Sequence, residues 1–187
     1  MGRQLSNWLY RTSTSGVALI ALILFLLFSV LILPGQSAKA LMDSGGAGSP
    51  DTSFLYSTAE LYQMAEAYGE QGRQAYIRAR FTFDLAFPVV YTLFLVTAVS
   101  WLFTRSFPVG SRWRAANLVP LVGAAFDYLE NVSTSLIMAR LPARTPLVDT
   151  LAPLFTLVKW VLVIGSFALV MVGLATSAWR WRQDQRG

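Results

Sequence analysis

The sequence contains four apolar segments. The loops between them and the two ends of the chain carry almost all of the basic residues. The segments cover residues 17–33, 81–103, 117–139 and 150–178. A helix needs roughly 20 apolar residues to cross the hydrocarbon core of a bilayer. Hydrophobic residues make up 55% of the chain and charged residues 13%, a composition too apolar for a soluble domain. The sequence therefore predicts an all-α, polytopic membrane protein, with residues 1–187 as a single integral membrane domain built as a bundle of four transmembrane helices.

The first apolar segment has two interpretations. Residues 17–33 form about 25 Å of helix, which is at the short end for crossing a membrane alone, and they end at Pro34-Gly35. A secretory signal is the alternative, because Ala38-Lys39-Ala40 has the form of a cleavage site and follows a basic N-terminal region. The apolar run is longer than the ~7–15 residues typical of a signal peptide, which favours an uncleaved anchor.

The connection after this segment, residues 34–80, changes character along its length. Its first part is rich in glycine and flexible by composition. The sequence Ser57-Thr58-Ala59-Glu60 then matches a capping box, and apolar residues follow at helical spacing, so we expect a helix over residues 58–68 that Gly69 and Gly72 end. Such a helix either lies on the lipid headgroups or packs as a lid over the outer mouth of the bundle.

The distribution of basic residues predicts the orientation. The N-terminal arm, the loop between the second and third segments and the C-terminal tail carry one acid and many arginines, namely Arg3, Arg11, Arg105, Arg112, Arg114, Arg180, Arg182 and Arg186. Basic loops stay on the cytoplasmic side of a membrane. We therefore expect a protein of the inner (plasma) membrane with both termini in the cytoplasm. The net charge of +5 does not indicate nucleic-acid binding, because the basic residues lie in short runs beside the apolar segments.

The third segment contains acids where a membrane helix least tolerates them. An acid at the centre of a spanning helix costs about 2.5–3.5 kcal/mol on insertion scales, so such residues usually face a bundle interior or a wet cavity. In a helix, Asp127, Glu130, Asn131 and Thr134 follow the i, i+3, i+4, i+7 spacing and share one face. The pattern predicts a polar site between packed helices.

Depth along the helices predicts which charges meet. At 1.5 Å per residue, Glu130 and Lys159 both lie about 13 Å below the outer ends of their helices, so we expect them to form an ion pair. Asp127 lies one turn deeper. Asp84 lies near the start of the second segment. Its presence has two equally good explanations: an ion pair with Arg80, four residues earlier, or a role in the site.

These acids predict a cavity that opens outward. Polar residues can also serve only to join helices, since such contacts average about 0.6 kcal/mol in membranes. Three acids against one buried base exceed that need, because the spare charge must be neutralised by a proton, a cation or water. The candidate cavity residues are Asp84, Tyr91, Asp127, Glu130, Asn131, Thr134 and Lys159, and the candidate gating or mouth residues are Arg73, Tyr76 and Arg80.

Four short patterns lie along the chain: Gly69 with Gly72-Arg73 and Tyr76, Asp84 with Phe87-Pro88 and Tyr91, the run Asp127 to Asn131, and Lys159-Trp160. Together they resemble a widespread group of uncharacterised bacterial four-span membrane proteins, which implies no activity. The architecture is also similar, more weakly, to the EXPERA group of sterol-isomerase and sigma-2-receptor-like proteins, whose acidic pocket takes a sterol or an amphiphilic amine. The chain lacks an acid in its first segment and has no His, so the resemblance does not extend to isomerase activity.

Three classes of function remain open. A binding or transport module would take an amphiphile, a lipid or a cation in the cavity. An enzyme, which we expect less, would use Asp127 and Glu130 as acid and base on a membrane lipid. A structural or assembly subunit would use its polar residues for packing alone. The expected partners are the lipid bilayer, a lipid or amphiphilic ligand and a membrane protein, without nucleic acid. We expect no cofactor or metal, because the chain has no His or Cys and a lysine lies near the acids.

Overall fold

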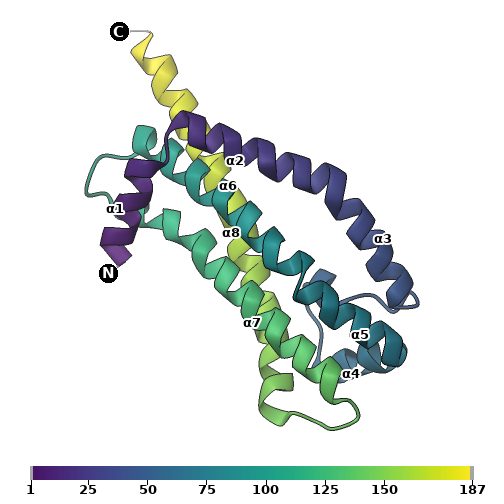
Figure 1. Cartoon of the computed structure of the whole chain (residues 1–187). Coiled ribbons are helices and arrows are strands. Elements are labelled where there is room, and N and C mark those ends of the chain that lie inside the picture. Colours follow the sequence, from purple (N-terminus) through teal and green to yellow (C-terminus); the bar gives the residue numbers. More distant parts are fainter. Residues whose placement is uncertain (1, 186–187) are drawn as a thin grey trace. The chain divides into compact units, whose positions relative to one another are not determined.

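The computed structural model describes residues 2–185, and within that range every regular element is a helix (Figure 1). The α-helices are α1 (Gly2–Thr12), α2 (Ser15–Leu27), α3 (Leu33–Asp43), α4 (Thr58–Ala67), α5 (Gly69–Arg80), α6 (Phe83–Ser106), α7 (Val119–Arg140) and α8 (Pro146–Asp184). A π-helical turn, Phe28–Ile32, joins α2 to α3, and 3-10 turns cover Pro50–Thr52 and Arg112–Leu118. The all-α prediction is confirmed. Arg186, one of the residues behind the predicted orientation, lies outside the described range.

Three helical stretches are long and apolar enough to cross a membrane. They are Ser15–Asp43, Gly69–Ser106 and Pro146–Gln183. The third predicted segment forms α7, which does not reach the same apolarity because Asp127 and Glu130 lie inside it. A membrane location is thus supported by three helices, while a fourth crossing and the sidedness remain predictions.

The chain divides into two compact units, which are described separately. The first unit comprises Met1–Leu26, Val90–Val122 and Leu162–Gly187, and the second comprises Leu27–Val89 and Gly123–Val161. Helices α6, α7 and α8 each contribute residues to both units.

The first unit has an apolar core around α6. Val99, Leu102 and Phe103 are buried there and pack against residues that include Leu169 of α8. A buried Asn117 joins two elements, because Ser6 Oγ donates to its side-chain oxygen at 2.8 Å and its amide donates to Ser100 Oγ at 3.1 Å. Such satisfied polar contacts hold α1 against the 3-10 turn before α7.

In the second unit, α4 packs on protein. The predicted capping box is confirmed, since Ser57 Oγ accepts from the Glu60 backbone N–H and the Glu60 carboxylate accepts from the Ser57 backbone N–H. Leu61 and Tyr62 are buried against Ile137 of α7 and Ala152 of α8. These contacts favour the lid over the interfacial helix, because the apolar stripe of α4 covers other helices.

The predicted helix end at Pro34-Gly35 is wrong. The helix continues to Asp43, and Pro34 occupies the first turn of α3, directly after the π-helical turn. Proline is tolerated in a first helical turn because its missing N–H would find no partner within the helix there, and π turns commonly insert within longer helices. The helix ends at two glycines with positive φ, where Gly45 N–H donates to Met42 O at 3.1 Å and Gly46 N–H donates to Leu41 O at 3.2 Å, a Schellman motif.

The two glycines predicted to end α4 have different roles. Gly69 has a φ of +60° and separates α4 from α5, as predicted. Gly72 lies inside α5, so its predicted role as a helix breaker is wrong. A Cβ at Gly72 would collide with the backbone oxygen of Asp43. Gly72 is therefore the point where the end of α3 approaches the backbone of α5.

Candidate functional site

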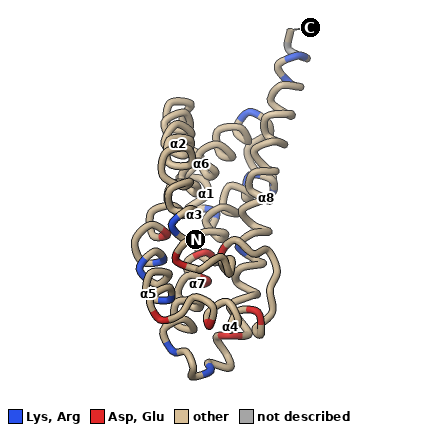
Figure 2. Tube along the Cα trace, turned by 90° about the vertical axis from the view of Figure 1, so that its right-hand side faces the viewer, with Lys and Arg blue, Asp and Glu red and all other residues tan. Residues whose placement is uncertain are grey.

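Five charged residues of the second unit form one ion-pair network. Arg80 Nη1 lies 3.0 Å from Asp84 Oδ2 and 3.2 Å from Asp51 Oδ2. Lys159 Nζ lies 2.7 Å from Asp51 Oδ1 and 2.5 Å from Glu130 Oε2. Each base thus lies between two carboxylates, and both bases share Asp51. Figure 2 shows acidic positions gathered near α4, α5 and α7, with basic positions on α5 among them.

The two ion pairs predicted from the sequence are present. Arg80 and Asp84 pair as neighbours at i, i+4, and Glu130 pairs with Lys159 from another helix. All four side chains are buried. Removing one member of a buried pair typically costs about 3–5 kcal/mol, because the other charge is left uncompensated. The network is therefore strongly coupled to the fold of the second unit.

Asp51 was not predicted as a site residue. It lies in the 3-10 turn Pro50–Thr52, and its backbone oxygen accepts from Trp160 Nε1 at 3.1 Å. Burial alone would raise the pKa of the Asp51 carboxyl, but the charges of Arg80 and Lys159 outweigh burial and hold that pKa well below its usual range. Asp51 is therefore ionised at neutral pH and joins the first loop to α5 and α8.

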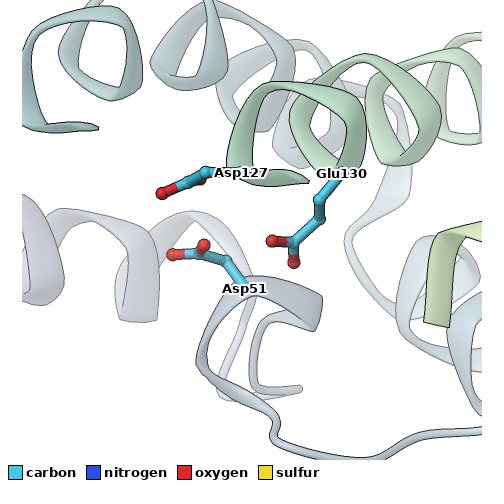
Figure 3. A group of neighbouring side chains, drawn as sticks. All are labelled: Asp51, Asp127 and Glu130. Atoms are coloured by element: carbon cyan, nitrogen blue, oxygen red, sulfur yellow. The ribbon is translucent and has the colours of Figure 1, made fainter. Parts of the chain in front are cut away.

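Asp127 brings a further carboxylate to the network. Carboxylate oxygens of Asp51, Asp127 and Glu130 all lie within 4.8 Å of one another. Figure 3 shows Asp127 and Glu130 extending from one helix toward Asp51 on the turn below. Three such oxygens suit a hard cation, but the ammonium of Lys159 already contacts two of the three acids. The protein thus supplies a cation of its own at this point.

Hydrogen bonds join the polar face of α7 to neighbouring elements. Thr156 Oγ1 donates to Glu130 Oε1 at 2.9 Å, and Arg80 Nη1 donates to Asn131 Oδ1 at 3.4 Å. Tyr76 donates to Thr134 Oγ1 at 3.0 Å. The predicted polar face of α7 is therefore buried and engaged with neighbouring elements.

The residues expected at the mouth occupy different places. Tyr76 and Arg80 are buried, with the guanidinium 4.6 Å from the centre of the Tyr76 ring. Arg73 donates to the Ala65 backbone oxygen at 3.4 Å, at the corner between α4 and α5. Tyr91, a predicted cavity residue, is buried in the first unit.

A cleft between α3 and α5 adjoins the network and consists of two hollows. The acidic hollow, of about 330 Å³, reaches Asp51 and Asp84. The basic hollow, of about 560 Å³, carries Lys39 and Arg78. The hollows share the lining residues Gln36, Ala40, Ala79, Arg80 and Phe83. One molecule could therefore occupy both.

The charges around the acidic hollow do not balance. The ion-pair network holds three carboxylates against two bases, an excess of one negative charge when all five groups are ionised. Buried charge without compensation is costly, so a site of this kind attracts protons or cations. Asp51 keeps 27% of its side chain exposed and provides access to this charge from the cleft.

No protein-family model matches the chain, and no curated protein or solved structure matches it either. The resemblance to bacterial four-span membrane proteins and the weaker one to the EXPERA group remain predictions.

Proposed function

We propose that the protein is an integral membrane protein that binds a cationic amphiphile in the acidic hollow. One observation carries this proposal: Asp51 and Asp84, two carboxylates of a buried network with excess negative charge, line a cleft. The four helical stretches α2–α3, α6, α7 and α8 would cross the inner membrane, with both termini in the cytoplasm. Such a protein would bind or transport its ligand without changing it chemically.

The lining of the acidic hollow favours an amphiphile over a bare ion. Leu33, Leu41 and Phe83 supply apolar walls, and the carboxylates supply the polar end. An ammonium group would approach the oxygens of Asp51 and Asp84 from the cleft, while Arg80, which also lines the cleft, holds both carboxylates in place. Charge-assisted hydrogen bonds of this type are about twice as strong as neutral ones.

Three ligands that share one alkyl chain would test the proposal. The full-length protein in a nonionic detergent would be titrated with decylamine, decanol and decanoate, and its melting temperature would be recorded. We expect decylamine to raise the melting temperature and the other two to have little effect, because only the amine compensates the excess charge. Equal stabilisation by decanol would contradict the proposal.

A matched pair of variants assigns the effect to the site. Asp84→Asn removes one charge from the acidic hollow. We expect the affinity for decylamine to fall about tenfold, because one charge-assisted hydrogen bond is lost. Glu66→Gln removes an exposed charge from α4 and should leave the response unchanged. An unchanged response in Asp84→Asn would move the binding site elsewhere and reject the acidic hollow.

A further inference from the structure

We infer that the ligand of the cleft is a zwitterionic phospholipid with a primary amine, whose ammonium occupies the acidic hollow and whose phosphate occupies the basic hollow. This inference rests on the proposed function and names the ligand class. It follows from the opposite charges of two hollows that share five lining residues. A ligand that fills both must carry both signs of charge.

The basic hollow has the composition of a phosphate site. Its lining holds three bases, Lys39 of α3 with Arg78 and Arg80 of α5, against a single acid, Asp43. Gln36, which the two hollows share, offers a neutral donor. Lys and Arg donors that converge from two elements are a common arrangement for binding phosphate. An alkylamine without a phosphate would leave these donors unused.

The acidic hollow favours a primary ammonium over a quaternary one. A primary ammonium has three N–H donors, which match the oxygens of Asp51 and Asp84. A quaternary ammonium has none and is typically held by a cage of aromatic rings. Among the described lining residues of this hollow, Phe83 is the one aromatic side chain. The headgroup chemistry is therefore that of phosphoethanolamine.

Exposed apolar side chains precede the α3 residues that line the cleft. Val30 and Leu31, which precede α3, are 66% and 71% exposed and belong to the candidate membrane span Ser15–Asp43. Lys39 lies about 12 Å farther along the helix than Leu31. Acyl chains can therefore lie along exposed apolar side chains while the headgroup enters the cleft.

Short-chain lipids, which are soluble as monomers, would test the inference. Binding of dihexanoyl phosphatidylethanolamine, phosphatidylcholine and phosphatidylglycerol to the full-length protein in nonionic detergent would be measured by thermal shift, with decylamine as the amine-only probe. We expect phosphatidylethanolamine to bind about tenfold more tightly than either other lipid, because only it satisfies both hollows with hydrogen-bonding groups. Equal binding of phosphatidylcholine would overturn the inference.

Variants of the basic hollow separate the inference from the proposed function. Lys39→Ala with Arg78→Ala should weaken the binding of phosphatidylethanolamine about tenfold without weakening that of decylamine, because the amine does not use these bases. The control, Arg112→Ala with Arg182→Ala, removes two exposed bases outside the cleft and should change neither ligand. Unchanged lipid binding in Lys39→Ala with Arg78→Ala would overturn the inference while leaving the proposed function intact. If the wild-type protein did not bind decylamine, the proposed function itself would be rejected.

Two further arms complete the test. Charge reversal, Lys39→Glu with Arg78→Glu, should abolish lipid binding and strengthen decylamine binding, a gain that mere destabilisation cannot produce. Soluble O-phosphoethanolamine should bind at least tenfold more weakly than the dihexanoyl lipid, because it lacks the chains that α3 would contact. Equal binding of this headgroup alone would show that the ligand is a soluble phosphoamine, and it would overturn the assignment to a lipid.

Discussion

Asp51 contacts both bases of the ion-pair network although it lies in a glycine-rich loop. Arg80 and Lys159 each have a second carboxylate, so Asp51 is the residue that connects two otherwise separate pairs. Its backbone oxygen is also fixed by Trp160. Asp51 thus joins the 3-10 turn Pro50–Thr52 to both α5 and α8.

The low pKa of Asp51 predicts how its contribution depends on pH. An unfolded Asp has a pKa of about 3.9, and the folded value of Asp51 is lower, so the folded state binds fewer protons in acid. The stability that Asp51 provides is therefore complete above about pH 4 and is lost as the pH falls below that. We expect Asp51→Asn to lower the melting temperature at neutral pH, and the gap to the wild type to narrow near pH 3. A gap that stayed the same down to pH 3 would show that the partners of Asp51 do not hold it ionised.

A double-mutant cycle tests the deepest pair. Lys159→Met leaves Glu130 without its base and should cost about 3–5 kcal/mol of unfolding free energy, measured by titration with a denaturing detergent. Adding Glu130→Gln should recover much of this loss, because the buried charge is removed with its partner. Asp51 keeps Arg80 in either variant, so the loop should stay docked. Additive losses would mean that the two residues do not interact.

Asp127 should respond differently from Glu130. Its carboxylate lies within 4.8 Å of two other carboxylates, so Asp127→Asn removes like-charge repulsion. We expect equal or higher stability together with weaker decylamine binding, because the excess negative charge falls. A strong loss of stability in a melting experiment would identify Asp127 as a structural residue.

The site could be predicted in part from the sequence. Helical spacing predicts the shared face of α7, the i, i+4 rule predicts Arg80–Asp84, and equal depth predicts Glu130–Lys159. Asp51 could not be found in this way, because 108 residues separate it from Lys159 and no periodicity links a loop to a helix. The Pro50-Asp51 pair predicts a turn at most.

At the scale of elements, the sequence predicts helices better than their ends. The capping box locates α4, whereas the proline rule ends the first apolar helix at residue 33 although the helix continues to Asp43. A π-helical turn cannot be anticipated from composition. The same limit applies to Gly72, where tertiary contact with the backbone of Asp43 decides the role of the glycine.

Gly72 gives a prediction for the approach of α3 to α5. Gly72→Ala should cost about 1–3 kcal/mol, because the added methyl group meets a backbone oxygen that cannot rotate away. Gly35→Ala, in α3, has open space around the new methyl group and should be neutral or stabilising by about 0.5–1 kcal/mol. Thermal melting of both variants in the same detergent would measure the difference. Similar effects at the two glycines would argue against close packing of α3 on α5.

At the scale of the whole molecule, the open question is which side of the membrane holds each loop. The described helices put residue 55 between α3 and α4 and residue 109 between α6 and α7, and both side chains are well exposed, at 70% and 91%. If α6 crosses the membrane once, the two positions lie on opposite sides. The excess of arginine near residue 109 predicts that this loop is cytoplasmic.

Cysteine labelling tests this orientation directly, because the chain contains no cysteine of its own. We expect Leu55→Cys to react with a membrane-impermeant maleimide added outside intact cells, and Val109→Cys to react only after the membrane is opened. The reverse pattern would invert the orientation and place the acidic hollow on the cytoplasmic side. Labelling of both positions from outside would show that α6 does not span the bilayer, and the network would then belong to a protein that lies on the membrane surface.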